Sequence, residues 1–434
     1  MRKREGWRSV RGSVGLTLLV AAFAAGGCGN ADEMPDATTT AGSGGTPVDS
    51  GGTGGAATGG AGTGGAATGG AGDRDAGPSD ERIDMNIGPL TDAGGDSDDQ
   101  RSDSANNGTP AVRFVGRFDG SDPAGPRFAW SGSGMIARFS GTSVGIKLGG
   151  AQQYTVLIDG VMKPKLLPAA GGALSAIASG LPEGEHVGEI YRRTEANQGE
   201  SQFLGFDFGA GTLLAPPPAP TRRMEMIGDS ITCAYGVEGA NMNCTYTEDT
   251  QDQYLAYGSI AARNVGADVT TVAWSGKGVV CNYGDDPTSC VDPLPVYYDR
   301  TLPERTDSQW NFSQWQPQVV VINLGTNDFS TAVDPTSAQF SAAYQAFLLH
   351  IRSKYPTALI LCTVAPLLGG SDLTTARAAI DAAVAATGDA NIKSFTMDPT
   401  DPADGYGCDY HPSVKTQQKM AAVLTAKLKT ELGW

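Results

Sequence analysis

Between residues 221 and 434, short apolar runs alternate with longer helical stretches. This alternation is typical of a doubly wound α/β domain with a parallel sheet. We expect residues 221–434 to form one such domain. Strands are predicted at 224–227, 269–274, 319–324, 359–364 and 392–397, and helices at 253–264, 338–354, 373–386 and 414–432.

Residues 110–214 have a different pattern, made of brief alternating or apolar runs. Turn-forming Asp-Gly, Ser-Gly and Pro residues separate these runs about every 8–12 residues, and no amphipathic helix is evident. The pattern indicates an all-β sandwich, jelly-roll-like in type. Residues 215–220, Ala-Pro-Pro-Pro-Ala-Pro, predict a stiff linker between this sandwich and the α/β domain. Sandwich strands are expected at 114–118, 135–139, 144–148, 154–158 and 187–191.

Residues 1–28 have the features of an export signal. Several basic residues precede an apolar run at 14–25 that is too short to form a permanent membrane span. Cys28 follows two glycines, as in a bacterial lipobox, so we expect a lipid anchor at Cys28. An ordinary signal peptide with an unrelated cysteine is the alternative. The expected location is a bacterial cell surface or outer membrane, or otherwise the secreted fraction.

Residues 29–109 are expected to form a disordered linker. The ten-residue Gly-rich unit at 52–61 repeats at 62–71, and an acidic stretch follows at 73–103. Such sequence buries too little apolar surface to fold, and its like charges extend it. The linker would hold the folded part away from a membrane.

The charge and composition exclude several classes of protein. There are 31 Lys and Arg against 47 Asp and Glu, for a net charge of −16, with no basic stripe. Nucleic acid is therefore not an expected partner. Three histidines and scattered cysteines leave little material for a metal cage, so neither a metal nor a cofactor is expected.

With Cys28 set aside, six cysteines remain, all beyond residue 230. In an exported protein an even number favours disulfides over free thiols. Cys281 and Cys290 are close enough to staple a Gly/Asp/Pro-rich loop, so this is the pair we predict first. The sequence does not choose among the other pairings.

Polar residues follow the predicted α/β strands directly, and the carboxyl ends of parallel strands meet at one edge of a sheet. Ser230 follows the first strand, and a serine needs a base to become a nucleophile. His186 lies in the β region and His350 lies within a helix, where a packing role is expected. His411 lies in a loop before the last helix and is the expected base. Asp409, two residues earlier, could orient the imidazole and stabilise its charged form.

Acyl transfer also needs donors for the charge that develops on a carbonyl oxygen. The N–H groups of Ser230 and Gly276 and the side-chain amide of Asn327 stand at three strand ends and predict an oxyanion hole. Gly278 is the alternative to Gly276, because a two-residue shift of the loop would exchange them.

The order of these residues resembles the four blocks of the SGNH (GDSL-like) hydrolases. The fuller strings resemble carbohydrate esterase family two, which joins a β-sandwich to an SGNH domain and removes acetyl groups from plant polysaccharides. The strings are Tyr191-Arg-Arg-Thr-Glu195, Phe203-Leu-Gly-Phe206, Ile227-Gly-Asp-Ser-Ile-Thr-Cys-Ala-Tyr-Gly236, Trp274-Ser-Gly-Lys-Gly278 and Asp409-Tyr-His-Pro-Ser413.

The resemblance implies Ser230 as nucleophile, His411 as base, and the oxyanion hole already named. The sequence departs from the SGNH pattern at Cys408, where the pattern has Asp three residues before the histidine. A Ser–His dyad without Asp409 therefore stays open.

Asp229 and Asp328, beside the blocks, are expected to cap turns or hold loops. Aromatic residues near the blocks could stack on sugars, although packing is the commoner role: Tyr235, Trp274, Tyr283 and Phe329.

The leading hypothesis is a surface-tethered serine esterase that deacetylates xylan or a related acetylated polysaccharide or oligosaccharide. One alternative keeps the same residues and acts on a lipid or thioester. The other is a non-catalytic carbohydrate-binding lipoprotein in which the sandwich is the working module. Loss of function in Ser230→Ala would separate the enzymes from the binding protein.

Overall fold

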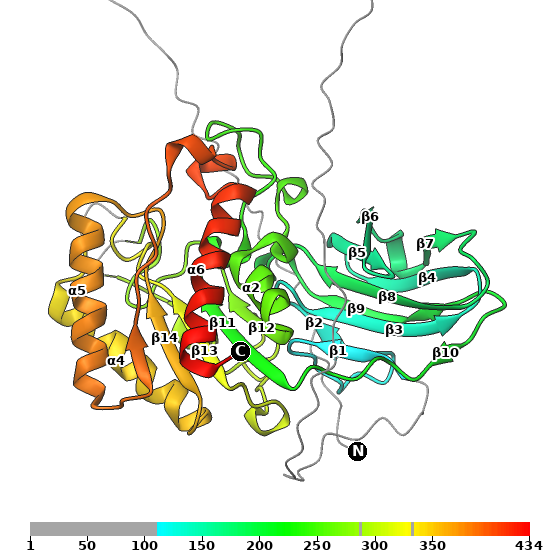
Figure 1. The fold of residues 1–434 in the computed structure, drawn as a ribbon, viewed down its shortest axis with the longest axis horizontal. Helices are drawn as coiled ribbons and strands as arrows, with labels where there is room; N and C mark the ends of the chain where they lie inside the picture. The colour runs from blue at the N-terminus through cyan, green and yellow to red at the C-terminus, as the bar shows by residue number, and fades with distance from the viewer. Residues whose placement is uncertain (1–110, 286–288, 331–333) are drawn as a thin grey trace, which may run out of the picture. The chain divides into compact units, whose positions relative to one another are not determined.

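The computed structural model describes residues 111–285, 289–330 and 334–434. The predicted export signal, Cys28 and the linker 29–109 lie outside the described residues. Figure 1 shows a β-rich part and an α/β part side by side. Among the described residues, no helix is both long enough and apolar enough to cross a membrane.

Residues 111–214 form two antiparallel sheets, which confirms the predicted sandwich. One sheet has the order β1-β3-β8-β5-β6, with β10 also paired to β3, and the other has the order β2-β9-β4-β7. The strands are β1 (Arg113–Val115), β2 (Arg127–Phe128), β3 (Gly134–Ser140), β4 (Ser143–Gly149), β5 (Tyr154–Ile158), β6 (Val161–Leu166), β7 (Leu174–Ser179), β8 (Glu185–Arg192), β9 (Ser201–Asp207) and β10 (Leu213–Leu214). The pattern did not predict β2, β7, β9 and β10, nor β6, which contains Pro164. This strand lies at a sheet edge, where a missing N–H is tolerated.

The α/β part contains one parallel sheet with the order β12-β11-β13-β14-β15, as predicted. The predicted helix at 253–264 is shorter, because 253–255 forms a separate 3-10 turn. The strands are β11 (Arg222–Gly228), β12 (Ala267–Ala273), β13 (Val319–Asn323), β14 (Leu359–Thr363) and β15 (Ile392–Ser394). The helices are α1 (Ser230–Cys233), α2 (Tyr257–Val265), α3 (Leu294–Tyr297), α4 (Ser337–Lys354), α5 (Gly370–Thr387) and α6 (Val414–Leu432).

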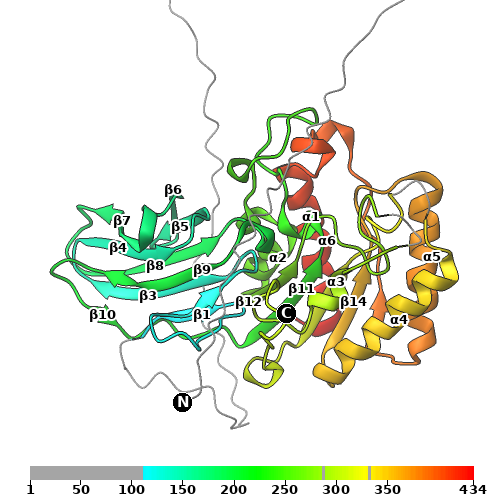
Figure 2. The same ribbon diagram turned by 180° about the vertical axis from the view of Figure 1, so that it is seen from behind.

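Helices cover both faces of this sheet. Alternate side chains of a strand point to opposite faces, so Val319 and Val321 pack with α2 and α6, whereas Val320 and Ile322 pack with α4 and α5. Figure 1 shows α2 and α6 in front of the sheet, and Figure 2 shows α4 from the opposite side. A sheet covered on both faces explains why its strands are almost continuously apolar.

The two parts share one hydrophobic core. Trp130 and Ala196, from the sandwich, belong to the same buried cluster as Val272 and Tyr298 of the α/β part. Trp130 is fully buried, and its indole N–H donates to the main-chain oxygen of Arg300 at 3.2 Å. The sandwich is therefore packed against the α/β part and not only joined to it through the linker 215–220.

A buried ion pair crosses the same interface. Arg117, from the sandwich, donates to Glu225 in the middle of β11 at 3.0 Å, and both side chains are fully buried. Glu225 also accepts hydrogen bonds from the hydroxyls of Tyr298, at 2.8 Å, and Tyr355, at 3.1 Å. The Arg117 guanidinium donates to the main-chain oxygens of Arg300, at 3.0 Å, and Tyr298. Removal of one partner would leave the other charged, buried and unpaired.

We predict that Arg117→Met lowers the free energy of unfolding by about 3–5 kcal/mol, the cost of breaking a buried ion pair on one side. Arg138→Met is the matched control, because Arg138 pairs with Glu185 at the surface, with side chains 40% and 57% exposed. Its expected cost is at most about 1 kcal/mol. Urea unfolding followed by circular dichroism measures both, and equal small losses would contradict the prediction.

Candidate active site

The turn between β11 and α1 presents Ser230 at the carboxyl edge of the sheet. Asp229 is the N-cap of α1, and its carboxylate accepts from the Ile231 amide at 3.0 Å. Gly228 has no room for a side chain, because a Cβ there would lie 2.0 Å from the Thr232 hydroxyl oxygen. Ser230 thus takes the first helical position, where its N–H has no acceptor within the helix.

Ser230 and His411 lie in hydrogen-bond contact although 181 residues separate them. The distance from His411 Nε2 to Ser230 Oγ is 2.8 Å. Burial lowers the pKa of His411, so the imidazole stays neutral, and able to accept a proton, to a lower pH than an ordinary histidine. The other two histidines pair with carboxylates elsewhere, His186 with Asp159 and His350 with Asp299.

A main-chain oxygen orients the imidazole. His411 Nδ1 lies 3.0 Å from the carbonyl oxygen of Asp409. A carbonyl can only accept, so Nδ1 must carry the proton and Nε2 is left free to accept from Ser230. This is the tautomer that a general base requires.

The Asp409 carboxylate faces away from the imidazole, although its charge opposes the lowering of the His411 pKa by burial, so its predicted orienting role stays a prediction. Its Oδ2 accepts instead from the Tyr235 hydroxyl at 3.1 Å and from the Tyr246 amide at 3.0 Å. The reason lies in the backbone, because Asp409 and Tyr410 both have positive φ, 51° and 62°. This rare conformation turns the carbonyl toward the imidazole and the carboxylate away from it, and it is kept only where the surroundings enforce it.

A disulfide between Cys244 and Cys408 helps to hold this backbone. Cys408 is the residue where the SGNH pattern has Asp, and here it forms a covalent link. Two further main-chain bonds join the same segments, from the Asp409 amide to the Cys244 carbonyl at 3.0 Å and from the Tyr410 amide to the Met242 carbonyl at 3.3 Å.

The predicted Cys281–Cys290 disulfide is confirmed. The expectation that all six cysteines pair is wrong for Cys233 and Cys362, which are free and buried. Cys233 belongs to α1 and Cys362 to β14, so each is held inside the fold by its own element. Burial raises the pKa of the Cys362 thiol to about 12 and that of Cys233 well above its ordinary value, which makes both unreactive.

The three predicted oxyanion donors lie together. Ser230, Gly276 and Asn327 line one cavity of about 550 Å³ with His411. Gly276 has a φ of +79° and open space beside its Cα, so its conformation favours glycine. At Gly278, by contrast, a Cβ would lie 1.9 Å from the Cys281 oxygen. Gly278 is therefore needed for close packing and does not line this cavity.

The amide of Asn327 is held in place from two sides. Its Nδ2 donates to the Lys277 oxygen at 2.9 Å and lies 3.4 Å from the Asp229 carboxylate. The second contact is long for a hydrogen bond, so the amide is held mainly by the Lys277 oxygen. Burial raises the pKa of Asp229 to about 7, with a further contribution from the charge of Asp328.

The structural roles predicted for Asp229 and Asp328 are confirmed. Asp229 caps α1, and the Asp328 carboxylate accepts from three successive amides of the neighbouring loop at 2.7–3.1 Å. Those amides belong to Val279, Val280 and Cys281. Asp328 thus fixes the loop that follows Gly276.

Two of the four aromatic candidates reach the cavity. Tyr235 and Tyr283 line it, whereas Trp274 and Phe329 are buried in the core. Tyr283 is 67% exposed and lies inside the Cys281–Cys290 loop. Lining residues that the sequence analysis did not single out are Ser275, Thr326, Ser330 and Leu367.

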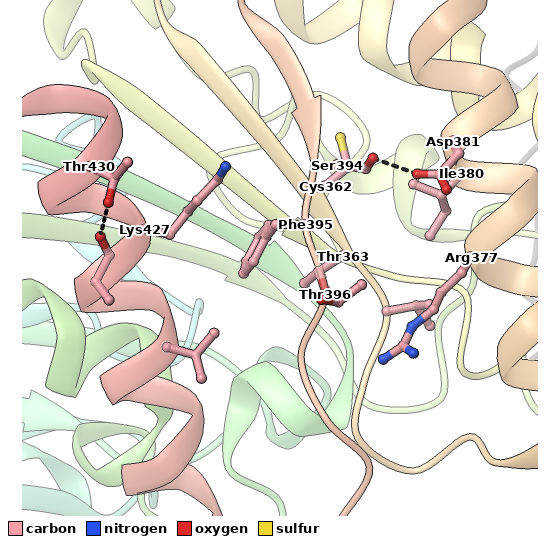
Figure 3. A pocket seen from close by; sticks show the side chains of 13 residues that line it. Cys362, Thr363, Arg377, Ile380, Asp381, Ser394, Phe395, Thr396, Lys427 and Thr430 are labelled. Atoms are coloured by element: carbon pink, nitrogen blue, oxygen red, sulfur yellow. Dashed lines mark hydrogen bonds between the residues drawn. The ribbon is translucent and has the colours of Figure 1, made fainter.

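A second cavity, of about 560 Å³, lies between α5, α6 and the edge strand β15. Figure 3 shows Arg377, Asp381 and Ser394 at its wall, and none of the predicted site residues belongs to it. In the described part of the chain, no group of three or more His, Cys, Asp and Glu side chains is placed to hold a metal ion. The chemistry is therefore assigned to the cavity around Ser230.

Comparison with known proteins gives two family matches. The family model for the carbohydrate esterase 2 N-terminal domain matches residues 114–218, and the model for the GDSL-like lipase/acylhydrolase family matches residues 226–419. The cellulase/esterase CelE of Acetivibrio thermocellus is 44% identical over 346 residues, which are 78% of this chain and 41% of CelE. The chain thus spans less than half the length of that relative. An acetylxylan esterase / glucomannan deacetylase of Cellvibrio japonicus is 28% identical over 72% of this chain and 88% of its own length.

Solved structures show the same similarity. A family two carbohydrate esterase from Clostridium thermocellum, in complex with cellohexaose, has 42% identity and a TM-score of 0.72 over 75% of this chain and all of its own. A family 2 enzyme from Corynascus thermopiles has 32% identity and a TM-score of 0.68, with the same coverage.

We predict that a fluorophosphonate, which modifies activated serines, labels Ser230. His411→Ala should slow the labelling at least about 10³-fold, because the base is lost. Asp409→Asn should slow it less than about tenfold, because asparagine tolerates positive φ and keeps the carbonyl in place. Intact-protein mass spectrometry measures the rates. A loss in Asp409→Asn as large as in His411→Ala would show that the carboxylate is required.

Proposed function

The chain belongs to carbohydrate esterase family 2, and from this premise we propose that it removes O-acetyl groups from acetylated xylan or a related hemicellulose. The family membership confirms the resemblance seen in the sequence. The observation that carries the proposal is the 2.8 Å contact between Ser230 Oγ and His411 Nε2 at the wall of an open cavity.

In the proposed mechanism, Ser230 Oγ attacks the acetyl carbonyl while His411 Nε2 takes its proton. The oxyanion that forms accepts hydrogen bonds from the amides of Ser230 and Gly276 and from Asn327. His411 then donates the proton to the departing sugar oxygen, which leaves an acetyl-serine. A water molecule activated by His411 hydrolyses this ester, and acetate and free Ser230 are released.

The cavity lining combines hydrogen-bonding groups, suited to a sugar, with apolar surface. Among the described lining residues, Leu367 is the one aliphatic hydrocarbon side chain, and hydroxyls or amides provide most of the rest. The rings of Tyr235 and Tyr283 and the Leu367 side chain also give the cavity apolar surface, so the lining alone does not separate an acetyl ester from the lipase or thioesterase alternative. Tyr235 and Tyr283 offer aromatic surfaces suited to a sugar ring.

The non-catalytic alternative has one point in its favour. A similar structure is described as a complex with cellohexaose, so a relative binds a glucan that carries no acetyl ester. Binding of unmodified glucan by this chain would not conflict with esterase activity, and both are measurable on the same protein.

We include export and lipid attachment at Cys28 in the proposal, with residues 29–109 between the lipid and the enzyme. The support is the basic, apolar and small-residue order of residues 1–28. Metabolic labelling with a palmitate analogue should mark the wild-type chain in the membrane fraction and leave Cys28→Ala unlabelled. An unlabelled wild-type chain in a bacterial host would refute lipidation.

We predict that the wild-type chain releases acetate from acetylated xylooligosaccharides or acetylated glucomannan. Ser230→Ala should lose at least about 10³-fold in rate, the scale for removal of a catalytic nucleophile. Calorimetric titration with cellohexaose, on both proteins, is the control for binding. No release by folded wild-type protein would reject the deacetylase proposal, and retained glucan binding would then support the binding protein.

A further inference from the structure

A buried carboxylate from the sandwich part reaches the edge of the catalytic cavity. Glu195 follows β8 and is 1% exposed. Its Oε2 accepts from the Ser275 amide at 2.6 Å, and its Oε1 accepts from the Ser275 hydroxyl at 2.5 Å. Both hydrogen-bond donors of this serine therefore point to one carboxylate.

Ser275 directly precedes Gly276, which is the expected oxyanion donor. The N–H of Gly276 belongs to the peptide that joins these two residues, so the position of Ser275 sets where that N–H lies. On the other side, the Gly276 carbonyl accepts from the Tyr283 amide at 2.8 Å. A loop around a glycine of positive φ is thus held at both ends, and Glu195 forms one of the two anchors.

The same carboxylate is linked to the nucleophile helix. Gln251 Nε2 donates to Glu195 Oε1 at 3.0 Å and to the Cys233 carbonyl, in α1, at 3.1 Å. Glu195 therefore connects the loop of Gly276 with the helix that begins at Ser230. These are the two elements that supply main-chain donors to the oxyanion hole.

A fully buried carboxylate is costly unless hydrogen bonds satisfy it. Burial raises the pKa of Glu195, and the hydrogen bonds from Ser275 and Gln251 oppose this change. A glutamine at 195 has one acceptor oxygen in place of two, so its NH2 group would face either the Ser275 amide or the Ser275 hydroxyl and Gln251. The carboxylate accepts from all three donors.

We propose that Glu195 is a positioning residue for catalysis, through which the sandwich part fixes the Gly276 N–H of the oxyanion hole. This inference rests on the proposed esterase function. Donors aimed at a developing oxyanion act mainly on the transition state, so misplacement should lower kcat more than it alters KM.

The test is Glu195→Gln, with steady-state kinetics on an acetyl ester. We expect kcat to fall about 10–100-fold, below the 10²–10³-fold cost of losing an oxyanion donor outright, with KM changed less than about threefold. Glu189→Gln is the matched control, because Glu189 lies on β8 and bonds to Tyr191 within the sandwich part. A folded Glu195→Gln protein with a kcat like that of the control would overturn the proposal.

Ser275→Ala gives a second test, whose single-variant result does not need the Glu195 variant to fold. It removes one of the two bonds to the carboxylate, so a smaller loss of kcat is expected, and the double variant should lose no more than Glu195→Gln alone. An unchanged kcat in Ser275→Ala, or losses that simply multiply, would contradict action through this serine.

Failure of the proposed function can be distinguished from failure of this inference. If the wild-type chain hydrolyses no acetyl ester, the deacetylase proposal fails. The rate of Ser230 phosphonylation then replaces kcat as the readout, because the phosphonyl oxygen uses the same donors. Slower labelling of Glu195→Gln than of Glu189→Gln would still support the positioning role, and equal rates would reject it.

Discussion

The buried contact between Arg117 and Glu225 fixes how the sandwich meets the parallel sheet. Such a pair adds little net free energy, because desolvation offsets the attraction between the charges, yet it is costly to break. Both groups are also hydrogen-bonded to their surroundings, so few other arrangements of the interface would satisfy them. The placement of Glu195 against Ser275 depends on this arrangement, since they belong to the two parts that the ion pair joins.

The groups proposed to be catalytic are positioned mainly by the backbone. A carbonyl oxygen orients the imidazole of His411, a helix start exposes the amide of Ser230, and a glycine loop presents the amide of Gly276. Two buried carboxylates lie behind the cavity wall. Glu195 and Asp328 hydrogen-bond to the loop that carries Gly276. The site therefore separates the residues that meet the substrate from the acidic residues that keep them in place.

Much of this arrangement could be predicted from the sequence, because the strands of the parallel sheet are apolar on both faces and polar residues follow them. Ser230, Gly276, Asn327 and His411 were found by that rule and by the order of their blocks. The contact of Glu195 with Ser275 crosses 80 residues and two layers, and no local pattern encodes it. The direction of the Asp409 carboxylate depends on two successive positive φ angles, which composition does not reveal.

The Cys244–Cys408 disulfide makes the structure around His411 depend on the compartment in which the chain folds. Its cysteines are 164 residues apart, so it can close only when nearly the whole α/β part has been made. In a reducing cytoplasm the sheet can form from its own apolar contacts, but the loop that carries His411 lacks the Cys244–Cys408 disulfide. Folded protein from such a compartment would differ from the oxidised protein in this bond beside His411 and in the Cys281–Cys290 bond. Yield and purity would not detect this difference, whereas a count of free thiols would.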